Sequence, residues 1–86
     1  MPRLSAFYGI VIYTYAREHG VAHFHAPYGG HEAVVDIARG VILERGLPRR
    51  PTRLVLEWTD LHRGELVEAW ERAGRGEPAG TIDPLP

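Results

Sequence analysis

The first half of the chain has the apolar and polar pattern of β-strands. Residues 7–15 (FYGIVIYTY) are dense in aromatic and β-branched side chains, which favour a pleated, half-buried backbone. Apolar and polar side chains alternate in residues 22–28 and 31–38, and Gly29-Gly30 between them fits a two-residue hairpin turn. A short apolar run over 41–45 follows a second tight turn. These segments predict four antiparallel strands.

The second half changes to helical spacing from about Pro51 to Ala73. Proline fits the first turn of a helix, where its missing N–H costs nothing. One wide apolar face, which we expect to pack on the sheet, is formed by Leu54, Val55, Trp58, Leu61, His62, Leu66, Ala69 and Ala73. Gly64 lies within this helix and predicts a slight bend there.

Two further features follow from the pattern of the second half. Leu56, Val67 and Trp70 form a second, narrower apolar strip on the helix, which we interpret as an interface for a partner or a second copy of the chain. Residues 74–86 are rich in glycine and proline and predict an extended tail, whose Ile82 and Leu85 dock back onto the body. We therefore expect one α+β domain over residues 1–86, with an antiparallel four-stranded sheet and one long C-terminal helix on one face.

Length and composition narrow the function classes. The chain has 86 residues and no cysteine, which excludes disulfides, thiolate metal sites and cysteine nucleophiles. So short a chain favours a shallow groove, or a face completed by another chain, over a deep enclosed active site. It has no apolar run of membrane-spanning length, so we expect a cytoplasmic protein with no membrane partner.

The charged residues predict one local basic patch, because the chain as a whole is nearly neutral. Ten cations, all arginine, balance eleven anions. Arg45, Arg49, Arg50 and Arg53 cluster before and within the start of the predicted helix, where the helix dipole also favours an anion. This cluster is a candidate site for RNA, DNA or an acidic partner. Aromatic side chains that would stack on bases are not interleaved with these arginines, and a solvated junction paired with Glu44 and Glu57 is the alternative.

The histidines form the second local cluster of functional side chains. Three of the five lie in HGVAHFHA, residues 19–26. With Gly29-Gly30 as the turn, the register places Asp36 directly opposite His23. Because side chains alternate between faces, His23 and His25 share one face of the sheet with Asp36, and Glu32 lies diagonally across.

Three interpretations of this face stay open. His19, His23 and His25 could bind zinc or another divalent ion and leave a coordination position for water. Alternatively, His23 and His25 act as catalytic acid and base, with Asp36 orienting His23, as in metal-independent RNA cleavage. The third interpretation is a solvated strand face without chemistry; likewise, His62 on the apolar helix face is interpreted as structural.

Four stretches of the chain resemble a known bacterial family. They are FYGIVIYTY, EHGVAHFHAPYGGHEAVVDI, LVLEWTDLHRGELVEAWERA and the closing GTIDPLP, which together cover almost the whole sequence. On these residues the chain resembles the family catalogued as domain of unknown function 4160. His19, His23, His25 and His62 match the pattern of that family, which has no established catalytic residues to carry over.

The resemblance implies a role. Such chains resemble the toxin-like half of a two-gene toxin and antitoxin module, whose other half is a small protein encoded by a neighbouring gene. Two alternatives remain beside this role: a non-catalytic binding module that forms a homodimer through the second helix strip, and a small metal-dependent or acid/base RNA-cleaving enzyme.

Overall fold

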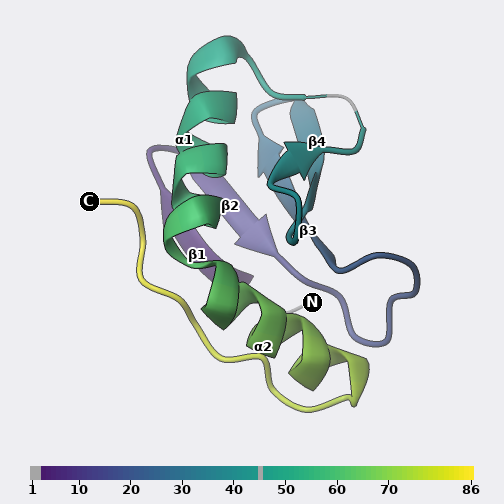
Figure 1. Ribbon diagram of the computed structural model, residues 1–86. Helices are drawn as coiled ribbons and strands as arrows, with labels where there is room; N and C mark the ends of the chain where they lie inside the picture. The colour runs from purple at the N-terminus through teal and green to yellow at the C-terminus, as the bar shows by residue number, and fades with distance from the viewer. Residues whose placement is uncertain (1–2, 45) are drawn as a thin grey trace.

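The computed structural model describes residues 3–44 and 46–86. In chain order the elements are β1 (Arg3–Phe7), β2 (Ile10–Tyr13), β3 (His23–Tyr28), β4 (His31–Asp36), β5 (Val41–Ile42), α1 (Arg49–Leu61) and α2 (Arg63–Gly74). The strands form one antiparallel sheet in sequential order, and α1 lies across one of its faces (Figure 1). The predicted α+β class is confirmed, whereas four strands and one long helix are corrected to five strands and two helices.

The predicted strand over residues 7–15 is wrong because it contains a turn. Tyr8 and Gly9 both have positive φ, +50° and +80°, and Phe7 pairs with Ile10 across them. This geometry is that of a tight two-residue hairpin loop, which needs left-handed backbone at both positions. The density of aromatic and β-branched residues hid the turn, although a glycine within a strand pattern is a known sign of one.

The hairpin of β3 and β4 has the predicted register. Tyr28 pairs with His31 and His23 with Asp36, so the two histidines of β3 lie on the same face of the sheet. β5 spans only Val41–Ile42, shorter than the predicted 41–45, and Arg45 lies outside the described residues.

The predicted helix over residues 51–73 is divided at His62, two residues before the glycine where we expected a bend. His62 has φ −119° and ψ 23°, outside the helical region. The Thr59 hydroxyl donates to the Val55 carbonyl 2.7 Å away, a bond that competes with the backbone and often bends helices. The change of direction leaves Leu61, expected on the core face, 62% exposed.

The core lies between the sheet and α1 and is centred on the fully buried Trp58. Its ring centre lies 5.4 Å from that of Phe7 in β1 and 5.7 Å from that of Phe24 in β3, so the helix and two strands meet at one indole. Its Nε1 donates to the Asp83 carbonyl at 2.8 Å, which also ties the tail to the core. None of the helices in residues 3–44 and 46–86 is long and apolar enough to cross a membrane.

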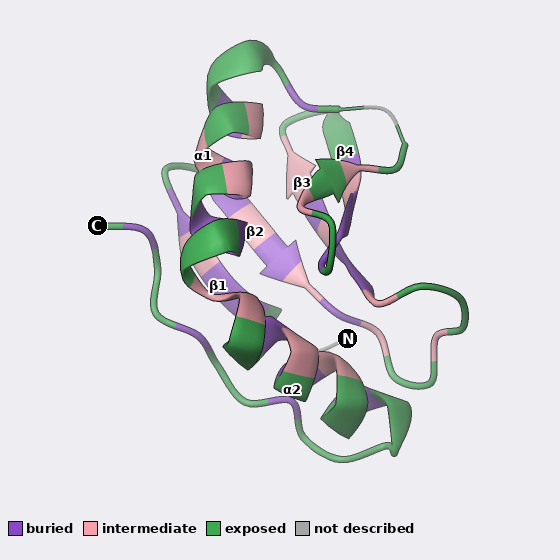
Figure 2. Ribbon diagram, viewed as in Figure 1, coloured by how far each residue is buried: buried purple, intermediate pink, exposed green. Residues whose placement is uncertain are grey.

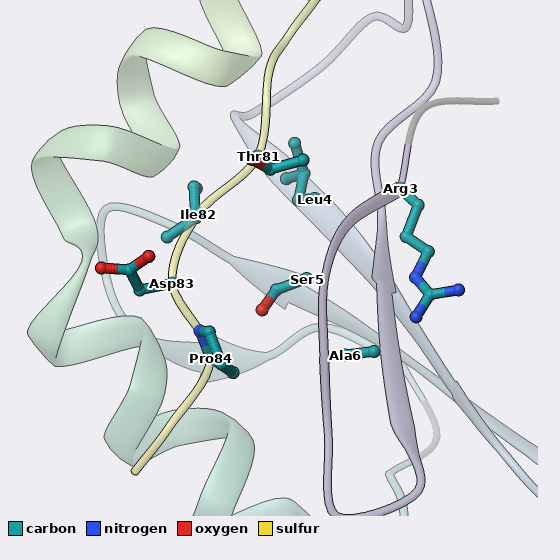
Figure 3. A pocket seen from close by; sticks show the side chains of 8 residues that line it. All are labelled: Arg3, Leu4, Ser5, Ala6, Thr81, Ile82, Asp83 and Pro84. Carbon is teal, nitrogen blue, oxygen red and sulfur yellow. The ribbon is translucent and has the colours of Figure 1, made fainter.

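The tail docks back as predicted. Ile82 and Leu85 are buried, and buried and exposed positions succeed one another along the tail (Figure 2). The Ile82 N–H donates to the Leu4 carbonyl at 2.8 Å, so the tail follows the edge of β1. A hollow of about 440 Å³ lies between them, and the Ser5 hydroxyl points across it toward the tail (Figure 3).

Candidate metal centre

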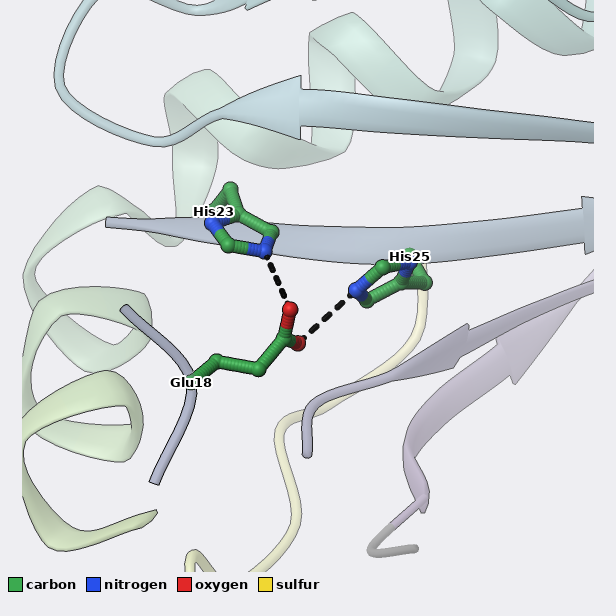
Figure 4. A group of neighbouring side chains, drawn as sticks. All are labelled: Glu18, His23 and His25. Carbon is green, nitrogen blue, oxygen red and sulfur yellow. Dashed lines mark hydrogen bonds and ion pairs between the residues drawn. The ribbon is translucent and has the colours of Figure 1, made fainter. Parts of the chain in front are cut away.

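Three side chains meet beside the start of β3: Glu18, His23 and His25. His23 and His25 come from alternate positions of the strand, so both rings project from the same face. Glu18 reaches them from the loop that joins β2 to β3. Its Oε2 lies 2.9 Å from Nε2 of His23, and its Oε1 lies 2.8 Å from Nε2 of His25 (Figure 4). One carboxylate thus bridges two imidazoles.

The loop that carries Glu18 is held by the end of α2. The N–H of Arg17 donates to the Ala73 carbonyl at 3.0 Å. Arg17 has φ +58°, a left-handed conformation that is uncommon for a side chain of this size. Its guanidinium lies against Gly76, where an added Cβ would come within 2.6 Å of Nη2. Packing between the loop and α2 therefore fixes the residue immediately before Glu18.

The hydrogen bonds of His23 determine where its ring carries a proton. Nδ1 lies 2.7 Å from the Val21 carbonyl oxygen, which can only accept, so Nδ1 is the donor. In a neutral ring Nε2 is then an acceptor, and it faces a carboxylate oxygen, which is also an acceptor. Two acceptors at 2.9 Å require positive charge between them. A metal ion supplies it, as does a second proton on the ring.

His25 differs from His23 because only one of its nitrogens is bonded. Nδ1 of His25 is buried and has no hydrogen-bond partner within the described part of the chain. Oε2 of Glu32 approaches it to 3.5 Å from β4, beyond good hydrogen-bond distance. The ring of Tyr15 meets the His25 ring edge-on, with the centres 4.4 Å apart. His23 is thus held at both ring nitrogens, whereas His25 is held at Nε2.

Partial burial strengthens the electrostatics of the group. The side chains of His23 and His25 are 11% and 14% exposed, and Glu18 is 27% exposed. The ring of Trp70 covers His23, with the centres 4.9 Å apart. Burial alone would raise the pKa of Glu18, but the hydrogen bonds and charge of His23 and His25 outweigh it and lower that pKa. Glu18 is thus held ionised, as a metal ligand must be.

The donor atoms fit a small divalent ion. One atom from each of the three residues lies within 4.8 Å of the others. Zinc at bond lengths of about 2.0–2.1 Å separates tetrahedral ligand atoms by about 3.3 Å, so each contact must lengthen by about 0.5 Å. Rotation of the Glu18 side chain, which is the most exposed of the three, provides this. Two imidazoles and one carboxylate leave a fourth position for water.

The structure assembles part of the predicted metal set and adds one residue. His23 and His25 come together, whereas His19 is exposed and is not among the three clustered donors. Glu18, the neighbour of His19 in the chain, takes the third place, and we did not select it from the sequence. A carboxylate next to a histidine-rich segment was the available signal, but only the course of the loop shows which residue turns inward.

Asp36 lies opposite His23 but engages another residue. Its Oδ1 accepts from the Arg39 N–H at 3.0 Å, and its Oδ2 pairs with the Arg39 guanidinium at 3.3 Å. Asp36 therefore stabilises the turn between β4 and β5. The ring nitrogens of His23 instead contact the Val21 carbonyl and the Glu18 carboxylate.

Among the other selected residues, Trp70 contacts the group through His23, and the rest engage other parts of the structure. Leu56, Val67 and Trp70 are half-buried against the core, so only part of each is open to a partner. His62 sits at the helix break, where its Nδ1 contacts Oε1 of Glu65 at 2.6 Å. Arg49, Arg50 and Arg53 line one hollow at the start of α1, and the fourth member of the predicted cluster, Arg45, is outside the described residues.

Comparison with known proteins gives a family. No curated protein and no solved structure matched the chain. A family model matches residues 9–71, a range that contains all three residues of the candidate metal centre. The chain belongs to the family described as Domain of unknown function (DUF4160).

Proposed function

We propose that this protein binds a divalent metal ion, such as zinc, through Glu18, His23 and His25 and uses it for hydrolysis. The carrying observation is that Nε2 of His23 and Oε2 of Glu18, both acceptors, face each other at 2.9 Å. Metal-binding histidines commonly donate their other ring N–H to a carbonyl or carboxylate, as His23 does to Val21. The Nε2–H of a neutral His25 explains its own contact with Glu18, so the His23 contact is the one that calls for a metal ion or an additional proton.

The chemistry follows from the coordination number. A bound ion with three protein ligands activates water in its fourth position by lowering the pKa of that water. A divalent ion held by Glu18, His23 and His25 would supply a nucleophilic water for hydrolysis of a phosphodiester, in which the bond from phosphorus to the leaving oxygen breaks and that oxygen takes up a proton. Glu32 lies at the edge of the group, with its Oε2 3.5 Å from Nδ1 of His25. RNA is the proposed substrate.

Calorimetric titration of metal-free protein with zinc tests the metal site. Wild type should bind stoichiometrically, and Glu18→Gln and His23→Ala should each weaken binding by at least about 100-fold. His19→Ala is the matched control, because it removes the exposed histidine beside Glu18. Unaltered affinity in Glu18→Gln, or equal losses in His19→Ala and His23→Ala, would contradict the proposed ligand set.

A toxin-like role in a toxin and antitoxin pair, which the sequence resemblance implies, is a second proposal. In this role the chain arrests growth when expressed alone, and the small protein encoded by the neighbouring gene relieves the arrest by binding it. Growth should be arrested by wild type and not by the His23→Ala/His25→Ala variant at equal protein level. Harmless expression of wild type, without any complex with that neighbour, would contradict the role.

A further inference from the structure

Two neighbouring hollows share Arg50 at the start of α1. The first, about 380 Å³, is lined by Arg49, Arg50 and Arg53. The second, about 300 Å³, is lined by Tyr8, Tyr28, Arg50, Pro51 and Leu54. One hollow is cationic and the other is aromatic, and one guanidinium belongs to both. These residues come from the β1–β2 turn, the end of β3 and α1, so only the fold brings them together.

The cationic hollow is not neutralised by the protein. Arg39, Arg63, Arg72 and Arg75 each pair with a carboxylate, but within residues 3–44 and 46–86 no ion pair involves Arg49, Arg50 or Arg53. The first turn of α1 has no acidic side chain, and Pro48 provides no side-chain cap. Three guanidiniums beside unfilled helix N–H groups attract an anion, and guanidinium matches phosphate in particular.

The aromatic hollow presents the ring of Tyr8 to solvent, and it is also lined by the half-buried Tyr28. Tyr8 is 57% exposed although it is a large aromatic residue, and it is held in the left-handed conformation at φ +50°. Its hydroxyl donates to the Pro86 carbonyl at 2.8 Å, so the end of the tail fixes its position. A Cβ added at Gly9 would touch the Tyr28 ring at 3.5 Å, which places that ring against the same turn. Strained residues of this kind concentrate at functional sites.

We propose that the two hollows together bind a segment of single-stranded nucleic acid. Bases stack on Tyr8 and Tyr28, while Arg49, Arg50 and Arg53 hold the adjacent phosphates. Aromatic platforms beside a cationic groove are the general means of binding single strands, whose bases are free to stack, unlike those of a duplex. RNA and DNA share this chemistry. The binding stands on its own residues, and only its use as a substrate-binding site rests on the proposed function.

Fluorescence anisotropy with a labelled 12-nucleotide single strand, in RNA and DNA forms, tests the proposal. The measurement is made in a metal chelator, so that failure of the metal site cannot affect it. Wild type should bind both strands and prefer them to a duplex of the same length. Tyr28→Leu should weaken binding about five-fold or more, because one stacking platform is lost.

Two matched double variants distinguish binding in this hollow from general attraction of nucleic acid to positive charge. Arg49→Gln/Arg53→Gln and Arg72→Gln/Arg75→Gln each remove two positive charges, but only the first pair lines the hollow. Each phosphate contact with a single strand contributes about 0.7 to the slope of log affinity against log salt concentration. The first variant, which loses two such contacts, should therefore reduce the magnitude of that slope by about 1.4. The second should leave affinity within about two-fold of wild type.

Three results would overturn the proposal: no change of anisotropy with wild type, equal losses in the two double variants, or duplex binding as tight as single-strand binding. Thermal melting shows whether each variant folds. If Tyr28→Leu does not fold, Tyr8→Asn replaces it, because asparagine accepts positive φ and removes the ring together with the hydroxyl that contacts Pro86. Tyr8→Phe retains the ring and should keep at least half of the wild-type affinity.

Discussion

Replacing Glu18 with glutamine tests metal binding while retaining the hydrogen bonds that Glu18 makes in the metal-free protein. Nδ1 of His23 is committed to the Val21 carbonyl, so its Nε2 is an acceptor that the glutamine N–H₂ satisfies. The glutamine oxygen accepts from Nε2 of His25, where the carboxylate accepted before. Both contacts survive without a charge. In a chelator, Glu18→Gln should therefore unfold within about 1 kcal/mol of wild type at neutral pH.

Zinc should make the two proteins differ greatly. At a free zinc concentration of about 100 times the dissociation constant, binding stabilises the wild type by about 2.7 kcal/mol. A domain of this length has an unfolding entropy of about 0.18 kcal/mol per degree, so its midpoint should rise by about 15 °C. Mutation of residues that only hydrogen-bond to a metal ligand can lower metal affinity by up to about 100-fold. Loss of the ligand Glu18 itself should therefore lower zinc affinity by at least that factor. Glu18→Gln then gains only about 0.4 kcal/mol, or about 2 °C.

Thermal unfolding by circular dichroism, in chelator and in buffered zinc, measures both differences. A wild-type midpoint that does not respond to zinc would refute the metal site. An equal rise in wild type and Glu18→Gln would show that zinc binds without the carboxylate. Glu18→Ala provides the contrast in chelator, because it removes both contacts and should be less stable than glutamine by about 1–3 kcal/mol.

Further predictions concern pH, the tail and the helix break. The lowered pKa of Glu18 means that folding favours its ionised form, so its contribution is complete above the ordinary value of 4.5 and is lost as pH falls through the lowered pKa. In chelator, wild-type stability should thus fall more steeply than that of Glu18→Gln below about pH 4.5 in acid titrations; parallel curves would contradict the role of the histidine contacts. Ile82→Ala should cost about 2–4 kcal/mol in urea unfolding, because a docked tail side chain that is only 6% exposed leaves a cavity; a loss below about 0.5 kcal/mol would show that the tail is undocked. Gly64→Ala, with nothing within 4 Å of the added carbon, should stabilise by about 0.5–1 kcal/mol; destabilisation would mean that the glycine is needed at the break.

The sequence was most informative where one periodicity persisted. Alternation on both sides of Gly29-Gly30 gave the complete β3–β4 register, including His23 opposite Asp36. Helical spacing identified Val55, Trp58 and Leu66 as core positions. Both are local patterns in which the repeat of the backbone decides which face is buried.

The features missed from the sequence depend on single backbone positions or on long-range packing. Tyr8-Gly9 adopts a hairpin turn inside an apolar run, and His62 leaves the helical region although its neighbours on both sides are helical. Glu18 is brought to the histidines by a loop that α2 anchors through Arg17. Likewise, residues far apart in sequence bring tyrosine rings beside Arg50, although no aromatic residue lies near it in the chain.

Elemental mass spectrometry of untagged wild type and of the His23→Ala/His25→Ala variant shows whether the protein holds a metal ion through these histidines. Both proteins should be expressed with zinc in the medium and exchanged into buffer without a chelator. The account predicts stoichiometric metal in the wild type and its loss from a folded double variant. Equal metal in the two proteins, or a wild type that takes up none even when zinc is supplied, would contradict it.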